Sequence, residues 1–301
     1  MSTASELVLP EGPLVSVAWL AHNVAHAAGT ALRIVDIRGK TLPPSAPPPR
    51  YLAKPEEFAL GHIPGAVFVD WTRDIVDPDD AVPVQIAKAE RFAARMGSLG
   101  IGDETAVVVY DDYSHMFAGR LHWALRYYGH DAVRILEGGL KAWADAGLSL
   151  EASGSGAEPT PAIFTPRPRP ELRRTADEVA QAIARGALLI DARGVPQFTG
   201  QVSAASRSGH IPTARNVPYP TLLTGPEGAF LPPSELRAAF TKAGIDANAL
   251  TPEREIIVYC NGGISATVPM TALALLGIRD VALYDGSWNE WGNDASRAIE
   301  R

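Results

Sequence analysis

The residue best suited to chemistry in this 301-residue chain is its one cysteine, Cys260. It follows the β-branched run Glu255 to Tyr259, and a helical pattern starts near Ala266. Between them lies the loop Asn261-Gly262-Gly263-Ile264-Ser265. Two glycines allow successive N–H groups to point inward as an anion-binding nest, and a helix N-terminus adds partial positive charge. Because the thiolate is the reactive form, this placement indicates a nucleophile; the alternative is a small buried hydrophobic residue.

The chain contains two copies of one pattern. Four blocks recur in the same order, and the second and fourth are each offset by 148 residues. The pairs are Ile34–Gly39 with Leu189–Gly194, Gly61–Ala66 with Gly209–Ala214, Val107–Asp111 with Ile256–Cys260, and Glu137–Trp143 with Asp285–Trp291. Such self-similarity predicts a duplicated domain. Asp111 occupies the position of the cysteine in the first copy, so we expect one active and one supporting copy.

Each copy alternates strand and helix patterns. Short apolar runs such as Ala106 to Tyr110 are typical of strands buried on both faces of a parallel sheet. Strand–helix–strand repetition predicts a doubly wound α/β fold with ligands at the carboxyl ends of the strands. We therefore predict two such domains in tandem, residues 1–151 and 172–301. The Gly/Ser-rich and Pro-rich residues 152–171 are expected to form an extended surface linker, and the Pro-rich residues 43–49 an exposed loop.

Helix boundaries are marked by capping residues. Ser16 and Thr175 are predicted N-caps for helices over 17–28 and 176–184, which Gly29 and Gly186 end. A third helix is predicted over 266–276, where Pro269 is tolerated because the first turn has no internal partner for its N–H.

Composition excludes several function classes. The chain carries 27 Lys plus Arg against 34 Asp plus Glu, a net charge of −7, which argues against binding the phosphate backbone of nucleic acids. No apolar run approaches the length of a membrane span, and the N-terminal residues lack an export-signal pattern, so no membrane association and a cytoplasmic location are expected. A single cysteine permits neither an internal disulfide nor a cysteine-based metal cluster, and no metal or other cofactor is predicted.

The combined motifs resemble rhodanese domains. They are the paired Asp-x-Arg strand ends, the Gly-His-Ile-Pro segments, the cysteine loop after a Val-Tyr strand, and the closing Asp-Gly-Ser-Trp-x-x-Trp. The resemblance covers residues 14–291 and is closest to tandem-domain sulfurtransferases of the thiosulfate and 3-mercaptopyruvate group. It implies that the Cys260 thiolate takes a sulfane sulfur from a small anionic donor and keeps it as a persulfide. An acceptor such as cyanide, a dithiol or a thioredoxin-like protein then removes the sulfur.

The resemblance also implies how the donor is bound. The N–H groups of Asn261, Gly262, Gly263, Ile264 and Ser265 would stabilise the additional negative sulfur. Arg193, Arg207 and Arg120 are candidates for the donor anion, because a guanidinium donates two parallel hydrogen bonds to an oxyanion. His62 matches a histidine proposed in the family to assist proton transfer. Alternatively, Arg193 pairs with Asp191 to hold the loop, and His62, like its counterpart His210, supports a shared turn.

The loop departs from both known patterns. Thiosulfate-preferring members typically carry Arg and Lys directly after the cysteine, where this chain has Asn261 and Gly262. The loop is nearer to the Cys-Gly-Ser-Gly-Val-Thr-Ala pattern of mercaptopyruvate-preferring members but lacks its serine. A substrate-binding arginine of the second domain is replaced by Gln197, so the preferred donor stays open.

Two other functions are considered. A phosphatase on a related fold would need a longer loop ending in an arginine, which is absent here. A rhodanese-like persulfide carrier or sensor that serves one protein partner is the non-enzymatic alternative, and turnover of small donors separates it from an enzyme.

Overall fold

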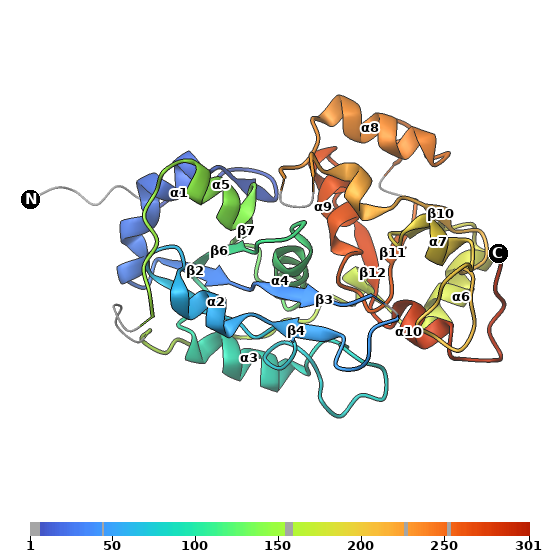
Figure 1. Ribbon diagram of the computed structural model, residues 1–301, viewed down its shortest axis with the longest axis horizontal. Helices are drawn as coiled ribbons and strands as arrows, with labels where there is room; N and C mark the ends of the chain where they lie inside the picture. Colours follow the sequence, from blue (N-terminus) through green and yellow to red (C-terminus); the bar gives the residue numbers. More distant parts are fainter. Residues whose placement is uncertain (1–6, 44, 154–158, 226–227, 252–253) are drawn as a thin grey trace, which may run out of the picture.

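The computed structural model describes residues 7–43, 45–153, 159–225, 228–251 and 254–301, and it contains two five-stranded parallel sheets (Figure 1). The first sheet has the spatial order β1 (Leu14–Val15), β7 (Val133–Leu136), β6 (Ala106–Tyr110), β2 (Leu32–Asp36) and β5 (Ala66–Phe68). The second has the order β10 (Arg215–Asn216), β9 (Leu188–Asp191), β11 (Ile256–Tyr259), β12 (Val281–Tyr284) and β8 (Arg173–Arg174). Read from opposite ends, the two orders are the same, which confirms the tandem α/β architecture.

Helices connect the strands of each sheet. The first domain contains α1 (Val17–Asn23), the 3₁₀ helix η1 (Val24–Ala28), α2 (Pro55–Leu60), α3 (Ala89–Ser98), α4 (Met116–Tyr127) and α5 (Gly139–Asp145). The second contains η2 (Pro170–Leu172), α6 (Ala176–Ala184), α7 (Val195–Phe198), η3 (Tyr219–Leu222), α8 (Pro233–Lys242), α9 (Thr267–Leu275) and α10 (Ser287–Trp291). Among the described residues, no helix combines the length and apolar character needed to cross a bilayer.

The predicted helix starts are confirmed. The Ser16 hydroxyl accepts the Trp19 N–H, and Thr175 forms a capping box with Glu178. The segment 17–28 is not one regular helix, however. It tightens into a 3₁₀ helix after Asn23, where the Asn23 side-chain amide donates to the Trp19 carbonyl.

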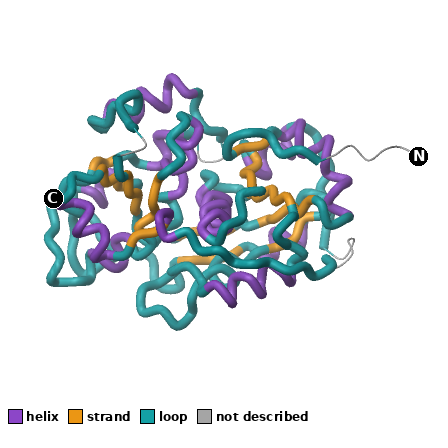
Figure 2. The backbone as a smooth tube through the Cα atoms, turned by 180° about the vertical axis from the view of Figure 1, so that it is seen from behind, coloured by secondary structure: helices purple, strands orange, loops and turns teal. Residues whose placement is uncertain are grey.

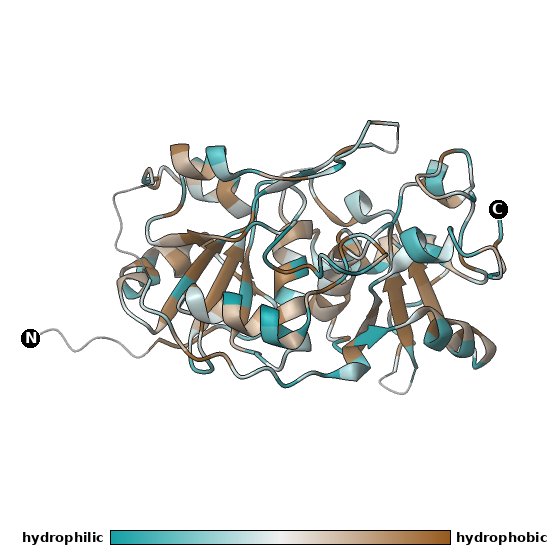
Figure 3. Ribbon diagram, turned by 90° about the horizontal axis from the view of Figure 1, so that it is seen from below, coloured by the Kyte–Doolittle hydropathy of each residue, from teal (hydrophilic) through white to brown (hydrophobic). Residues whose placement is uncertain are grey.

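A central hydrophobic cluster includes residues of both domains, and each domain has a second cluster of its own. Strand residues alternate between faces, so that Val107 and Val109 of β6 and Ile256 and Val258 of β11 face the same central cluster. Between the sheets, α4 of the first domain packs on α9 of the second, as the view from behind indicates (Figure 2). Gly119 permits this close approach, because an added Cβ would lie 2.5 Å from the Thr267 hydroxyl. The central strands of both sheets are strongly hydrophobic (Figure 3).

Two segments predicted as simple spacers are attached to the first domain. Residues 159–169 have no regular structure but hydrogen-bond along it, with Ala162 N–H donating to Gly97 and Arg167 N–H to Tyr128. The predicted linker residues 154–158 lie outside the described residues. The Pro-rich stretch near residues 43–49 connects β3 (Gly39–Thr41) to β4 (Tyr51–Ala53), an antiparallel hairpin that extends toward α10 (Figure 1).

Candidate active site

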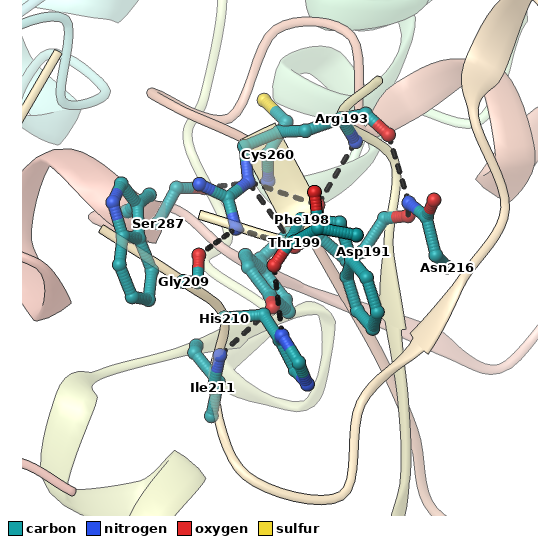
Figure 4. Close-up of polar contacts among 12 residues, drawn as sticks. Asp191, Arg193, Phe198, Thr199, Gly209, His210, Ile211, Asn216, Cys260 and Ser287 are labelled. Atoms are coloured by element: carbon teal, nitrogen blue, oxygen red, sulfur yellow. Dashed lines mark hydrogen bonds and ion pairs between the residues drawn. The ribbon is translucent and has the colours of Figure 1, made fainter. Parts of the chain in front are cut away.

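Cys260 lies at the carboxyl end of β11, where it is almost fully buried. Its N–H donates to the Ser287 hydroxyl at 3.1 Å, and its carbonyl accepts the Trp288 N–H at 3.0 Å. Ser287 in turn donates to the Tyr284 carbonyl at 2.7 Å. The turn between β12 and α10 therefore fixes the cysteine backbone on both sides (Figure 4).

The loop after Cys260 presents free donors. Within the described part of the chain, none of the N–H groups of residues 261–266 donates a hydrogen bond. Gly263 has a φ of +74°, a left-handed conformation that glycine adopts without strain, and the nine-residue helix α9 begins at Thr267. Gly262, Gly263 and Ile264 are buried, whereas Asn261 and Ser265 are partly exposed. The loop has the features of an anion-binding nest beside the thiol.

The first copy of this loop binds the carboxyl group of Asp111. Asp111, at the position of the cysteine, accepts the N–H groups of Phe117 (2.9 Å), Ala118 (3.0 Å) and Tyr113 (3.2 Å) through its carboxylate. Burial raises the pKa of Asp111 to about 7, although these backbone bonds lower it. The first copy of the loop thus binds a carboxyl group. In the second copy the N–H groups of Gly262 and Ala266, the counterparts of Tyr113 and Phe117, have no acceptor among the described residues, whereas the Thr267 N–H, the counterpart of Ala118, donates to the Ile264 carbonyl at 3.1 Å.

Arg120, predicted from the sequence to bind the donor, contacts protein groups beside the Cys260 loop. It is fully buried, and its guanidinium lies 2.7 Å from the Asp285 carboxylate. It also donates to the Val84 carbonyl at 2.9 Å and to the Gly263 carbonyl at 3.4 Å. Protein groups occupy the guanidinium, so it supports the loop from the first domain.

Arg193 has a structural role, which agrees with the alternative given for it above. It pairs with Asp191 at 2.6 Å and donates to the Gly209 carbonyl at 2.8 Å (Figure 4). Arg38 of the first copy makes the same two contacts, with Asp36 and the Gly61 carbonyl. Because the first copy lacks a cysteine, the shared contacts with the aspartate and the glycine carbonyl stabilise the strand end. The Arg193 Nη1 has no hydrogen-bond partner in the part of the chain that the structure describes, so donor binding by Arg193 stays a prediction.

Arg207 is also separate from the loop. Its guanidinium donates to main-chain carbonyls of the C-terminal segment, those of Trp291, Gly292, Asp294 and Arg297. These bonds hold residues 291–297 against the domain, and donor binding by Arg207 stays a prediction.

His62 supports a turn. Its Nδ1 pairs with the Phe58 carbonyl at 2.9 Å, and its Nε2 lies 3.5 Å from Glu151. His210 has equivalent contacts with the Phe198 carbonyl and Glu300. The two histidines therefore share a structural role in their repeats, and the structure does not bring His62 to the Cys260 loop.

Several residues at the loop were not predicted from the sequence. Val84 and Tyr51 of the first domain and Asn289 of α10 surround Gly262, where an added Cβ would lie 2.6 Å from Val84 Cγ2. Gln197, on α7, is partly buried. Ser287 could have been found by comparing the repeats, because Gly139 stands at its place in the copy that lacks the cysteine.

Comparison with known proteins decides the family. The Rhodanese-like domain model matches residues 16–146 and again residues 175–294. The chain belongs to the rhodanese family. It is 36% identical over 253 residues to the 3-mercaptopyruvate sulfurtransferase of Escherichia coli, covering 81% of this chain and 85% of that protein. It is 34% identical over 286 residues to the thiosulfate sulfurtransferase of Bos taurus, covering 92% and 91%.

Other rhodanese relatives extend the comparison. The sulfur carrier protein TtuD of Thermus thermophilus is 34% identical over 264 residues, covering 82% of this chain and 89% of that protein. The crystal structure of SseA from Escherichia coli superposes with a TM-score of 0.78 at 32% identity, covering 92% of this chain and 99% of SseA. The predicted resemblance and the tandem fold are both confirmed.

Proposed function

We propose that this rhodanese-family protein is a sulfurtransferase that carries a sulfane sulfur on Cys260. One observation supports this assignment most strongly: two N–H groups beside Cys260, those of Gly262 and Ala266, have no acceptor among the described residues, and their counterparts in the first copy bind the Asp111 carboxyl group. Free N–H groups next to a nucleophilic sulfur can stabilise a persulfide, because its terminal sulfur is negatively charged.

The first half-reaction forms the persulfide. With thiosulfate, the Cys260 thiolate attacks the outer sulfur, a new S–S bond forms, and sulfite leaves with the electron pair of the old S–S bond. With 3-mercaptopyruvate, the carbon–sulfur bond breaks and its electron pair leaves with carbon, which takes up a proton to give pyruvate. The free N–H groups of the loop would stabilise the charge on the transferred sulfur.

The second half-reaction regenerates the enzyme. Cyanide attacks the terminal sulfur, the S–S bond to Cys260 breaks, and thiocyanate leaves while the thiolate is restored. A dithiol acceptor would instead become a persulfide and then a disulfide with release of sulfide. A thioredoxin-like protein is the macromolecular acceptor that fits this chemistry.

In the described part of the chain, the three arginines predicted to bind the donor, Arg120, Arg193 and Arg207, all contact protein groups. Main-chain N–H groups and uncharged side chains would therefore provide most of the contacts to the donor, and the Arg193 Nη1, which has no hydrogen-bond partner among the described residues, is the remaining guanidinium donor. This arrangement favours 3-mercaptopyruvate, with one carboxylate, over the dianion thiosulfate. It also disfavours a phosphatase, whose phosphoryl group needs an arginine clamp.

Turnover with cyanide tests the enzymatic proposal. Thiocyanate release is measured with thiosulfate and with 3-mercaptopyruvate for the wild type and Cys260→Ser. Multiple turnovers with either donor, absent in Cys260→Ser, support an enzyme. A single Cys260-dependent turnover without further cycles favours a persulfide carrier. The similarity to the sulfur carrier protein TtuD supports this alternative.

A further inference from the structure

A tyrosine of the first domain reaches the catalytic loop of the second. Tyr51 begins β4, and its hydroxyl accepts a hydrogen bond from the Asn289 side-chain amide at 3.1 Å. Asn289 belongs to α10, and its own N–H donates to the Asn261 carbonyl at 2.8 Å. The tyrosine hydroxyl is thereby connected to the residue directly after Cys260.

The Tyr51 ring is held firmly by its own domain. It makes an edge contact with Trp71, with ring centroids 5.7 Å apart. Trp71 in turn donates from its indole N–H to the Leu52 carbonyl of the same hairpin at 2.9 Å. At Gly39 of the partner strand, an added Cβ would lie 2.1 Å from the Trp71 indole nitrogen, so the hairpin lies directly on this ring. The hydroxyl is positioned by packing before a donor arrives.

The Tyr51 proton is free for a ligand. A tyrosine hydroxyl can both donate and accept, and here Asn289 uses its acceptor capacity. Within the described part of the chain, the Tyr51 O–H donates to no protein group. The hydroxyl oxygen lies 3.6 Å from the position of a Cβ on Gly262, so it adjoins the open nest.

Electrostatics is consistent with this placement. Burial raises the pKa of Tyr51, and the negative charge of the Cys260 thiolate raises it further, although Asn289 opposes the shift. The hydroxyl therefore keeps its proton at neutral pH and remains a hydrogen-bond donor.

We propose that the Tyr51 hydroxyl donates a hydrogen bond to the anionic sulfur donor as the donor binds over the Cys260 loop. Tyr51 acts as a neutral counterpart to the arginine that the loop lacks, and the first domain contributes directly to the site. This role depends on the proposed sulfur transfer.

Tyr51→Phe isolates the hydroxyl, because the ring and its contact with Trp71 are kept. Loss of a hydrogen bond to a charged ligand is expected to lower kcat/KM by roughly ten- to a hundred-fold, mainly through KM. Asn289→Ala, which removes the group that orients the hydroxyl, should lower kcat/KM less. Tyr51→Leu also removes the ring, and its additional effect measures packing.

The measurements distinguish the role of the Tyr51 hydroxyl from sulfur transfer as a whole. Thiocyanate formation gives kcat and KM with 3-mercaptopyruvate, and a thermal melt checks the fold of each variant. A wild-type KM for folded Tyr51→Phe would overturn the role of the hydroxyl while sulfur transfer stands. A lower kcat at unchanged KM would also contradict donor binding. Absence of turnover and of persulfide in the wild type would instead refute the proposed function, and the Tyr51 role with it.

Discussion

The Arg120 guanidinium lies 2.7 Å from the Asp285 carboxylate, and both side chains are buried where the two domains meet. Arg120 comes from α4 of the first domain, whereas Asp285 precedes the turn that holds the Cys260 backbone. Asp285 also accepts the Ile86 N–H at 3.0 Å and lies 3.3 Å from Arg173. The first domain therefore contacts the Cys260 loop through a buried ion-pair cluster.

Removal of Arg120 should destabilise the protein strongly. Arg120→Met leaves a buried carboxylate without its main partner, which typically costs about 3–5 kcal/mol in free energy of unfolding. Urea unfolding measures the change. Arg167→Met is the control, because Arg167 is largely exposed and 3.8 Å from Asp103, an ion pair worth about 0–1 kcal/mol. Equal effects of the two substitutions would contradict the proposed support.

Gly262 should tolerate no side chain. In Gly262→Ala the new methyl group meets Val84 Cγ2 at 2.6 Å, which displaces the loop, and we expect at least about tenfold lower kcat/KM. The double variant Gly262→Ala/Val84→Ala lacks the clashing methyl group of Val84 and should regain part of the activity. Gly194→Ala is a matched control, since its nearest neighbour lies at 3.8 Å. Full activity of Gly262→Ala would mean that the loop is not confined by the first domain.

Asp111 should make stability depend on pH. Its pKa is about 7 in the folded protein against 3.8 ordinarily, so the folded state binds more protons between these values. Its contribution is complete below about pH 4 and is lost as the pH rises through about 7, by at most about 1.4 kcal/mol per pH unit.

In the Asp111→Asn variant the side chain at this position does not titrate. From pH 5 to pH 8 the wild type should therefore lose free energy of unfolding relative to the variant. Urea unfolding at four pH values gives this difference. A constant difference would show that Asp111 is already ionised across the range.

His62 should matter for stability rather than for catalysis. His62→Gln is expected to lose about 1 kcal/mol in free energy of unfolding, because contacts in the turn are weakened, with kcat within about threefold of the wild type. His210→Gln should behave alike, since its contacts are equivalent. A loss of about 10²-fold or more in kcat for His62→Gln alone would indicate acid–base catalysis after all.

The fold could be predicted largely from local signals. The repeated blocks defined two domains, and the apolar runs and capping residues located β6, β11, α6 and α9. Helix α1 was predicted too long, because the local pattern does not distinguish an α-helix from the 3₁₀ turn that follows Asn23.

The site was predicted in part. Cys260 and its loop follow from a short sequence segment, whereas the partners of an arginine depend on distant residues. Arg120 pairs with Asp285, which is 165 positions away in the sequence. Arg207 donates to carbonyls of residues 291–297. Tyr51 was missed for the same reason, since only the folded hairpin brings it to Asn289. The structural alternatives given for Arg193 and His62 agree with the internal repeat, because Arg38 and His210 make the equivalent contacts.

The intact mass of the reduced protein after incubation with 3-mercaptopyruvate or thiosulfate, and again after cyanide, tests the central claim most directly. We expect a gain of one sulfur atom that cyanide removes and that Cys260→Ser does not show. No gain from either donor, or an equal gain in Cys260→Ser, would contradict a persulfide on Cys260.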